Sequence, residues 1–508
     1  MRKIFSIIAF VFLLIASAQS PYAGEGETRE YGAGANGGVP RFTLNQAILT
    51  ALQRNPDIQR AKQEIERTKG IFLELRGEAF PRIDATGSVT NTDPHLNTIG
   101  RGSGSAEDNG GVPTAYILRI QASQPIFSGG RIFAQIRGAE FQRDAAYFSF
   151  RETVDAVISL VRQQFYQILL NRALIGVQEE SVSLLESQLR DQQNRFEAGT
   201  VPRFNVLQAQ VALSNQFPEL ISARNNYRIA QLQLARTIGL DFNPNRGDAP
   251  PLDAIGELRQ EPRPIALTRA IEIAKERRPL LKREKANVLS TNQQVNIARS
   301  NFLPQINATA SADARSNAIS ENIGDARTGY VVGASGSWSI WDWGQNLGRL
   351  KQARAVLEQS KITLDDAERQ VELEVQQAYS NLQQGAELIR SQQQNVSQAQ
   401  EALRLASARL GAGAGTQLEV LNARVEVTRA QSTTLQALFN YNAALAEFDR
   451  ATATEVIYSN ALDEPRTRDR VKSDAKPTPA PKPTPLPLNY SGNREPVGAR
   501  GGTRNDYK

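Results

Sequence analysis

Hydrophobic and polar positions follow two different periods along this chain, and each period occurs twice. Aliphatic or aromatic side chains recur every seven residues from Val154 to Phe196, and the same spacing returns from Val375 to Leu410. A seven-residue period sustained this long predicts helices that pack lengthwise against other helices. At 1.5 Å per residue, a helix of about 65 residues is roughly 100 Å long. Such a helix is too long for the interior of a globular domain, so it must project from one or line a space.

Four shorter segments alternate strictly between apolar and polar residues, which predicts β-strands with one apolar and one polar face. They cover about 82–90, 115–125, 305–313 and 330–340. Each has the length that a tilted strand needs to cross a bilayer. Aromatic residues stand at the strand ends, where a membrane girdle is expected: Tyr116, Tyr330, Trp338, Trp341 and Trp343. The alternation by itself also fits a soluble sheet with one wet face.

Four strands cannot close a barrel, and lipid does not tolerate open strand edges. If these segments cross a membrane, several chains must therefore share one barrel. Three copies of the chain give twelve strands.

The chain contains the same pattern in tandem. Pro304 stands 223 positions after Pro81, and Gly413 stands 214 positions after Gly199. The two offsets differ because the Gly/Ser/Asp-rich loop between the first pair of strands is longer in the first copy. We therefore expect two repeats, at 42–242 and 265–453, joined by a proline-containing linker at 243–264.

Each repeat is expected to hold a first helix, two strands, a long helix and a return helix. The first helices start near Leu44 and Leu267 and run to about residues 79 and 302, unless Pro56 and Pro279 each start a new helix after a short preceding one. The long helices cover about 130–197 and 344–411, and the return helices about 204–238 and 418–451. Pro218 lies inside the first return helix, where we expect a kink.

The two ends of the chain have compositions unlike the repeats. Arg2-Lys3, an apolar run and Ala16-Ser17-Ala18 form the pattern of a signal peptide covering residues 1–18. Residues 19–41 are Gly-rich and expected to be flexible. Residues 454–508 contain alternating Pro and Lys or Thr and predict a basic, disordered tail.

Composition lowers the expectation of an enzyme. The chain has no cysteine and a single histidine, His95, which removes thiolate sites, His-based triads and multi-histidine metal sites. We expect no catalytic residue, cofactor or metal. The net charge of +6 lies at the two ends, so the body is near neutral and no nucleic-acid partner is predicted.

Glycine-containing turns join each long helix to its return helix. The first reads Arg195-Phe-Glu-Ala-Gly-Thr-Val-Pro202 and the second Arg409-Leu-Gly-Ala-Gly-Ala-Gly-Thr416. We expect glycine to end the long helix in the left-handed conformation, and Thr200 or Thr416 to cap the return helix. An ordinary helical-hairpin turn explains these glycines equally well.

With these turns, the tandem copies and Pro125-Ile-Phe-Ser-Gly-Gly-Arg131 before the first long helix, the chain resembles the TolC family of outer-membrane efflux proteins. The resemblance covers about residues 42–453. It implies a homotrimer with a twelve-stranded β-barrel in the outer membrane, continued by an α-helical tunnel in the periplasm. It also implies a periplasmic adaptor protein and an inner-membrane pump as partners, and export of small molecules or polypeptides.

The resemblance carries over onto residues of the two turns. It assigns adaptor contact to the turn residues Gly199, Thr200, Val201, Gly413, Gly415 and Thr416. It assigns the constriction of the closed tip to Glu419, Asn422, Asn205 and Gln208, where the family has acidic residues. A ring of Glu419 carboxylates would favour cations, although a carboxylate at a helix start is also simply favoured by the helix dipole. Leu410 and Gly415 replace the family's tyrosine and arginine latch, so a different latch is expected.

The alternative interpretation is a periplasmic coiled-coil adaptor or scaffold. It predicts one helical hairpin per chain, whereas the repeat predicts two.

Overall fold

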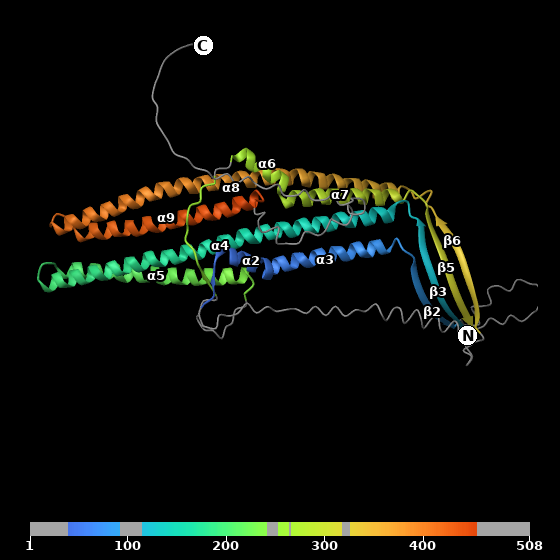
Figure 1. Ribbon diagram of the computed structural model, residues 1–508, viewed down its shortest axis with the longest axis horizontal. Coiled ribbons are helices and arrows are strands. Elements are labelled where there is room, and N and C mark those ends of the chain that lie inside the picture. Colours follow the sequence, from blue (N-terminus) through green and yellow to red (C-terminus); the bar gives the residue numbers. More distant parts are fainter. Residues whose placement is uncertain (1–38, 92–113, 241–251, 264–265, 317–325, 455–508) are drawn as a thin grey trace, which may run out of the picture. The chain divides into compact units, whose positions relative to one another are not determined.

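The computed structural model describes residues 39–91, 114–240, 252–263, 266–316 and 326–454. The predicted signal peptide, almost all of the Gly-rich segment, the loop after the first strand and the proline-rich tail lie outside the described residues. Within them the chain is mostly helical, with one four-stranded and one two-stranded sheet (Figure 1).

The two copies have the same helices in the same order. The first copy holds α2 (Leu44–Arg54), α3 (Pro56–Gly77), α4 (Arg131–Glu197) and α5 (Arg203–Thr237). The second copy holds α6 (Leu267–Arg277), α7 (Pro279–Ser300), α8 (Gln345–Gly411) and α9 (Gln417–Ala451). In both copies these helices have 11, 22, 67 and 35 residues. The prediction of a mostly helical fold with two tandem repeats is confirmed.

The first predicted helix of each copy is broken in two at a proline. The side chain of Asn55 accepts hydrogen bonds from the backbone N–H groups of Asp57 and Ile58, at 2.8 and 3.1 Å, and so caps α3. Pro279 likewise stands at the start of α7, although Arg278 before it gives no side-chain cap. Proline lacks the N–H that would continue the preceding helix but fits the first position of a new one. The uninterrupted helix was therefore wrong, and the alternative, that these prolines start new helices, is correct.

Helix α4 is the central element, because α3, α5, α7 and α9 all pack against it (Figure 1). Its heptad residues Val154, Val161 and Ile168 are almost fully buried. The second copy places small residues in the matching seam. A Cβ added to Gly385 would lie 3.1 Å from the Cα of Tyr441, so glycine lets α8 and α9 approach closely. Pro218 lies inside α5, which runs unbroken past it.

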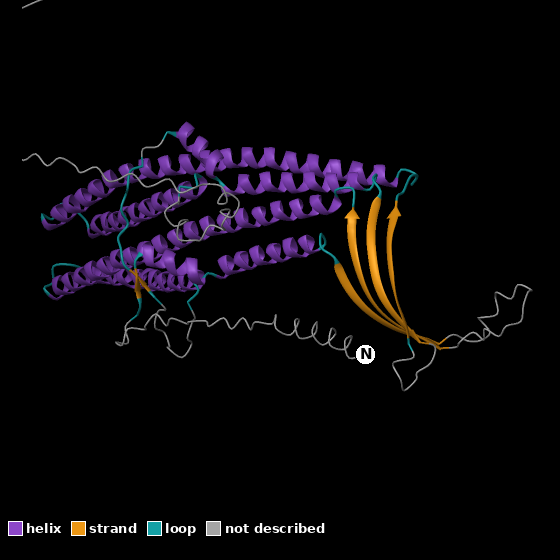
Figure 2. Cartoon of the chain, turned by 45° about the vertical axis from the view of Figure 1, so that its right-hand side comes forward, coloured by secondary structure: helices purple, strands orange, loops and turns teal. Residues whose placement is uncertain are grey.

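The four-stranded sheet is antiparallel, in the order β2-β3-β5-β6. Its strands are β2 (Arg82–Asn91), β3 (Thr114–Phe127), β5 (Gln305–Ser316) and β6 (Arg327–Ser337). The strands join the ends of α3, α4, α7 and α8 at one end of the sheet (Figure 2). β6 ends before the predicted position, and directly after it the Trp338 indole N–H donates to the Phe302 carbonyl at 3.1 Å, where α7 has just ended. The outermost strands, β2 and β6, are the two edges.

The described part of the linker between the copies crosses the helices. Its β4 (Asp253–Ala254) pairs in parallel with β1 (Arg41–Phe42). Arg172 of α4 donates to the carbonyls of Ala254 and Gly256, each at 2.7 Å. Further along, the Tyr441 hydroxyl of α9 donates to the Glu261 carbonyl at 2.6 Å. The linker is thus tied to both copies.

Across the described residues, none of the helices has a stretch apolar and long enough to span a membrane.

Candidate functional site

The first tip turn ends α4 with a left-handed glycine, as predicted. Gly199 has φ 71°, and its N–H donates to the carbonyl of Phe196 at 2.9 Å. The backbone N–H and the hydroxyl of Thr200 both donate to the Arg195 carbonyl, at 2.9 and 2.8 Å. These bonds satisfy the last carbonyls of the helix in a Schellman arrangement. Thr200 therefore closes α4, and the residue before α5 is Pro202, which gives no side-chain cap.

The second tip turn repeats this geometry and adds a cap. Gly413 has φ 74°, and the N–H of Ala414 donates to the Arg409 carbonyl at 2.9 Å. The hydroxyl of Thr416 accepts from the N–H of Glu419 at 3.3 Å and so caps α9. Of the two threonines proposed as caps, Thr416 caps a return helix and Thr200 does not.

Gly415 is required by close approach. A Cβ at this position would lie 3.0 Å from both the Cβ of Arg409 and the backbone nitrogen of Leu410. The guanidinium of Arg409 also donates to the Ala414 carbonyl at 3.2 Å. The turn is therefore compact, and Val201 in the first turn is half-buried.

The four predicted constriction residues have different surroundings. The Glu419 carboxylate lies 3.8 Å from the guanidinium of Arg409, with the two side chains 42% and 62% exposed, so this pair contributes little to stability. Asn422 is exposed and lines a cavity between the hairpins. Within the described part of the chain, no hydrogen bond or ion pair joins Asn205 or Gln208 to either residue. A single chain therefore shows no polar bond that joins all four.

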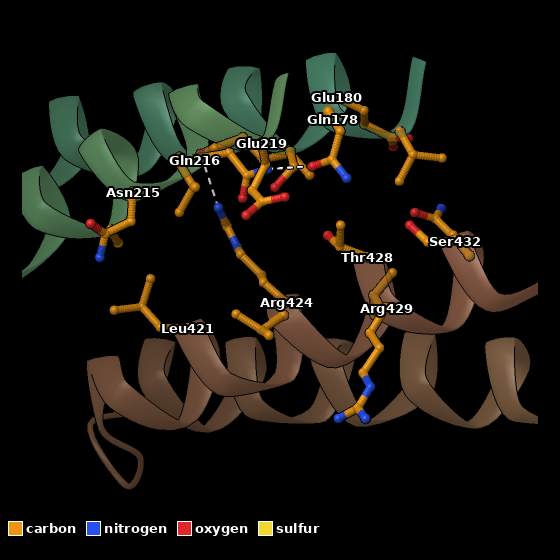
Figure 3. Close-up of a pocket in the computed structure, with 18 of the residues that line it drawn as sticks. Gln178, Glu180, Asn215, Gln216, Glu219, Leu421, Arg424, Thr428, Arg429 and Ser432 are labelled. Carbon is orange, nitrogen blue, oxygen red and sulfur yellow. Dashed lines mark hydrogen bonds between the residues drawn. The ribbon is translucent and has the colours of Figure 1, made fainter. Parts of the chain in front are cut away.

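A cavity of about 550 Å³ separates the two helical hairpins, α4–α5 and α8–α9. Figure 3 shows Arg424 reaching from α9 toward the opposite wall, where Gln216 and Glu219 lie. One guanidinium nitrogen, Nη1, donates to the Leu184 carbonyl of α4 at 2.9 Å. Gln216 and Gln178 are hydrogen-bonded to each other on that wall. The side chain of Arg424 thus bridges the hairpins some way above the tip.

Arg424 carries a charge that is poorly compensated. Its Nε is buried without a hydrogen-bond acceptor among the described residues. Burial lowers the pKa of the guanidinium below its ordinary value, because a charged group loses hydration there. No sequence pattern pointed to this role, since Arg424 stands among many charged residues on a helix.

The strand sheet has the two faces that the alternation predicted. The apolar face leaves large side chains uncovered: Ile83, Val89, Leu118, Ile120, Tyr330 and Val332. On the polar face, Arg119 of β3 forms two bonds to Asp313 of β5, at 2.8 and 3.0 Å, and Arg315 forms a third at 3.0 Å. This cross-strand pair fixes the register on the polar side.

The predicted aromatic residues stand at both ends of the sheet. Tyr330 is 84% exposed near one end, and Tyr116 lies near the same end but is half-buried. Trp338, Trp341 and Trp343 follow β6 at the other end, where the rings of Trp341 and Trp343 meet edge to face at 5.7 Å. Trp343 has φ 55° and is 89% exposed, which is an uncommon backbone conformation for an aromatic residue.

A buried ion cluster near the break between α6 and α7 was not predicted. Arg278, whose side chain is 1% exposed, contacts Glu152 at 3.0 Å and Glu374 at 2.8 Å. It also donates to the Arg450 carbonyl at 2.7 Å, as Asn55 donates to the Thr237 carbonyl at 2.7 Å in the first copy. Arg278 and Asn55 each stand directly before a proline that starts a helix, and each donates to a carbonyl at the end of a return helix. This shared position before proline is the sequence signal that could have predicted the contact.

Asp155 lies beside this cluster on α4. Burial, with a smaller effect from the neighbouring Glu152 carboxylate, raises the pKa of Asp155 to about 6. Nearby, Asp449 is paired with Arg162 and Arg263 at 2.9 and 3.0 Å. These charges join α4, α7, α8, α9 and the linker into one body.

Comparison with known proteins agrees with this architecture. A family model described as outer membrane efflux protein matches residues 47–240 and 270–454. The outer membrane efflux protein BepC of Brucella suis is 23% identical over 412 residues, covering 81% of this chain and 85% of that protein. The alkaline protease secretion protein AprF of Pseudomonas aeruginosa is 24% identical over 415 residues, covering 82% and 83%.

The fold itself is shared with solved channels. The Campylobacter jejuni CmeC outer membrane channel superposes with a TM-score of 0.71 at 16% identity, covering 80% of this chain and 85% of that one. The family model and the relatives define an outer-membrane export channel, which is not an enzyme. The chain belongs to the outer membrane efflux protein family. The resemblance to the TolC family is thereby confirmed, and the adaptor alternative does not fit a chain with two hairpins and four strands.

Proposed function

We propose that three copies of this chain form one duct, with a twelve-stranded barrel in the outer membrane and a helical tunnel in the periplasm. The observation that carries this proposal is the four-stranded sheet. It has two unpaired edges, β2 and β6, and an apolar face that the rest of the described chain leaves uncovered. Lipid accepts the apolar face but not the edges. Pairing β6 of one copy with β2 of the next removes every edge.

The tunnel is supported by the two hairpins. Each long helix has 67 residues, about 100 Å at 1.5 Å per residue. The hairpins end in the two compact turns. We assign contact with a periplasmic adaptor to these turn residues: Gly199, Thr200, Val201, Gly413, Gly415 and Thr416. The adaptor would couple the duct to an inner-membrane pump, which makes it the exit of a three-part export system.

The proposed cargo is small toxic molecules or polypeptides. Relatives named for polypeptide secretion and relatives named for efflux of small molecules match the chain at the same identity. AprF is named for secretion of alkaline protease. The toluene efflux pump outer membrane protein TtgC of Pseudomonas putida is 24% identical over 409 residues. The constriction is assigned to Glu419, with Asn422, Asn205 and Gln208 near it. Three Glu419 carboxylates at the threefold axis would favour cations.

The same proposal places cleavage of the signal peptide after residue 18 and export to the outer membrane. Tyr116, Tyr330, Trp338 and Trp341 would then stand at the two membrane–water interfaces, where aromatic side chains are favoured.

The duct is tested with the purified mature protein in detergent and in planar lipid bilayers. We expect a trimer by light scattering and discrete conductance steps that favour potassium over chloride. In intact cells, protease should cut within residues 92–113 of the exported protein. A monomer that needs no detergent would contradict the duct.

Adaptor contact is tested separately by site-specific crosslinking. The chain has no cysteine of its own, so a single cysteine can carry a crosslinker without background. Thr200→Cys and Thr416→Cys should capture the same periplasmic protein, and Gln359→Cys on the exposed side of α8, far from the turns, should not. Capture at all three positions, or at Gln359 alone, would refute the assignment to the tip.

A further inference from the structure

The internal repeat relates every position of one copy to a position of the other. The offset is 223 from α2 to β2 and 214 from β3 to α5, as the helix bounds require. Single hydrogen bonds obey it: Gln124 donates to the Ala79 carbonyl at 3.1 Å, and the equivalent Trp338 donates to the Phe302 carbonyl at 3.1 Å. The strand ladders obey it too, since Arg82 pairs with Ser123 and Gln305 with Ser337.

One large contact joins the two copies near the sheet. Helix α4 and strand β3 of the first copy pack against α7 and β5 of the second. The equivalent contact would join α8 and β6 to α3 and β2. Within the described chain, β6 and β2 are instead the two free edges of the sheet.

Two glycines of the first copy mark the contact that exists. Gly129 lies so close to the end of α7 that an added Cβ would be 2.7 Å from the Ser300 carbonyl oxygen and 3.0 Å from the Cβ of Leu303. Gly138 faces Gln293, whose Cβ would be 3.5 Å from an added Cβ. The hydroxyl of Ser290 also donates to the Gly138 carbonyl at 3.2 Å.

The equivalent positions of the free surfaces carry the opposite sizes. Trp343 stands where the first copy has Gly129, and its counterpart on α3 is Gly77, where α7 has Ser300. Gln352 stands where the first copy has Gly138, and its counterpart is Gly70, where α7 has Gln293. An added Cβ at Gly70 or Gly77 would meet nothing within 4 Å, and both glycines are exposed.

Within a single chain nothing explains why the α8 surface has large residues and the α3 surface has glycines, the reverse of the contact between α4 and α7. Glycine inside a helix lowers helix stability, and here it packs against nothing. Trp343 keeps the left-handed backbone of its glycine counterpart, φ 55° against 60°, which is unfavourable for a side chain with a Cβ. Both features fit a contact in which the large residue of one surface fills the gap above the glycine of the other.

Building on the proposed trimer, we infer that Trp343 and Gln352 of one copy pack over Gly77 and Gly70 of the next copy, so that a second copy of this chain is the partner of α3. The occupant is another copy because the equivalent surfaces, α4 with β3 and α7 with β5, already pack against each other within one chain. At the contact between copies, the α8 side carries the large residues, Trp343 and Gln352. At the contact within the chain, the equivalent α4 side carries the glycines, Gly129 and Gly138.

The same relation gives the register of the strands between copies. Within the chain, Gln121 pairs with Ser311 and Ser123 with Thr309. The offsets turn these pairs into Ser335 of one copy opposite Ser88 of the next, and Ser337 opposite Thr86. All four side chains belong to the polar face, so the pairing also keeps the apolar face continuous around the ring.

The register is tested by disulfide formation in isolated outer membranes, because the chain has no other cysteine. The variant S335C/S88C should give a covalent trimer under mild oxidation. The matched control S335C/D84C places its cysteines on the same two strands and the same face, but four residues out of register, roughly 14 Å apart along the strand. It should stay monomeric in denaturing gels.

The outcomes separate this inference from the proposed trimer. A trimer by light scattering that crosslinks in the control but not in S335C/S88C, or in neither, would overturn the register and leave the duct standing. A protein that is monomeric in detergent would refute both.

The packing over α3 is tested by exchanging the residue sizes at the predicted contact, so that it carries the same residues as the contact between Gly138 and Gln293 within the chain. G70Q improves the helix propensity of α3 but should crowd Gln352, so the heated trimer should dissociate at a temperature several degrees lower in detergent gels. Q352G/G70Q recreates the arrangement of Gly138 and Gln293 and should restore most of that loss. A G70Q trimer as stable as the wild type or more stable would overturn the contact, because substitution of a solvent-exposed Gly70 would not weaken the trimer and would favour helix α3.

Discussion

The guanidinium of Arg278 lies 2.8 Å from the carboxylate of Glu374, and the arginine side chain is only 1% exposed. Arg278 stands directly before the proline that starts α7, whereas Glu374 is on α8. The same guanidinium contacts Glu152 of α4 and the last turn of α9. One side chain thus joins the body of the second copy to the central helix of the first.

Removing this side chain should destabilise the protein strongly. Arg278→Ala leaves Glu152 and Glu374 with only the longer contacts to Arg450, at 3.6 and 3.3 Å, in a poorly hydrated site. Removing one partner of such a buried cluster costs about 3 kcal/mol. We expect the thermal unfolding midpoint in detergent to fall by several degrees. Arg269→Ala is the matched control, because its partner Glu272 and the arginine are both 67% exposed. An equal effect of the two substitutions would show that the buried cluster is not what holds these helices.

Asp155 should make stability depend on pH. Its pKa is about 6 in the folded chain against an ordinary value of 3.8, so the folded state holds this proton more tightly than the unfolded state. The stabilisation is complete below about pH 4 and is lost as pH rises through 6, by up to about 3 kcal/mol. Asp155→Asn should therefore be more stable relative to wild type at pH 7.5 than at pH 4.5.

The check is the difference in unfolding midpoint between those two pH values. Asp144→Asn serves as control, because that carboxylate is 44% exposed beside Arg143. If both variants follow the wild-type pH profile, the raised pKa of Asp155 is not coupled to folding.

Two glycines with the same backbone angle should respond differently to alanine. Gly199 and Gly239 both have φ 71°, so each substitution has the backbone cost of about 1 kcal/mol. At Gly239 the new Cβ would also lie 2.6 Å from the Arg54 carbonyl oxygen, whereas at Gly199 nothing lies within 4 Å. We expect Gly239→Ala to lower the unfolding midpoint clearly more than Gly199→Ala, as measured by circular dichroism. Similar losses would mean that the end of α2 yields easily.

Replacing the bridging arginine of the cavity should cost little. Arg424→Met loses one hydrogen bond to Leu184 but also removes a buried Nε that has no acceptor, so we expect a change within about 1 kcal/mol. Arg162→Met should cost more, because the carboxylate of Asp449 is only 3% exposed and would lose one of its two arginine partners, with Arg263 remaining. Denaturant titration of the two variants gives the comparison, and a larger loss at Arg424 would show that the bridge is a major support of the hairpins.

Patterns that repeat along the chain were readable from the sequence. The heptads from Val154 onward, the alternation after Pro81 and the constant offsets predicted the helices, the strands and the tandem copies. They succeed because a helix face and a strand face each have a fixed period. The left-handed glycines at both tips were predictable for a related reason, since few other residues adopt that conformation.

Contacts between distant segments were not readable in this way. Arg278 and Arg424 look like ordinary helical charges, and only the fold brings the carboxylates and carbonyls that surround them. The break at Asn55 was left open because a proline near a helix start fits either one helix or two. The constriction residues were assigned by resemblance, and within the described chain no hydrogen bond or ion pair joins Asn205 or Gln208 to Glu419 or Asn422.

The equal lengths of α4 and α8 limit how the two halves of the chain can diverge. Their side chains differ at most positions, but both helices have 67 residues and both return helices have 35. One residue inserted into α4 alone would lift its turn by 1.5 Å and rotate everything beyond the insertion by about 100°. The two tips would then no longer end level, so an insertion in one half is tolerable only with a matching insertion in the other.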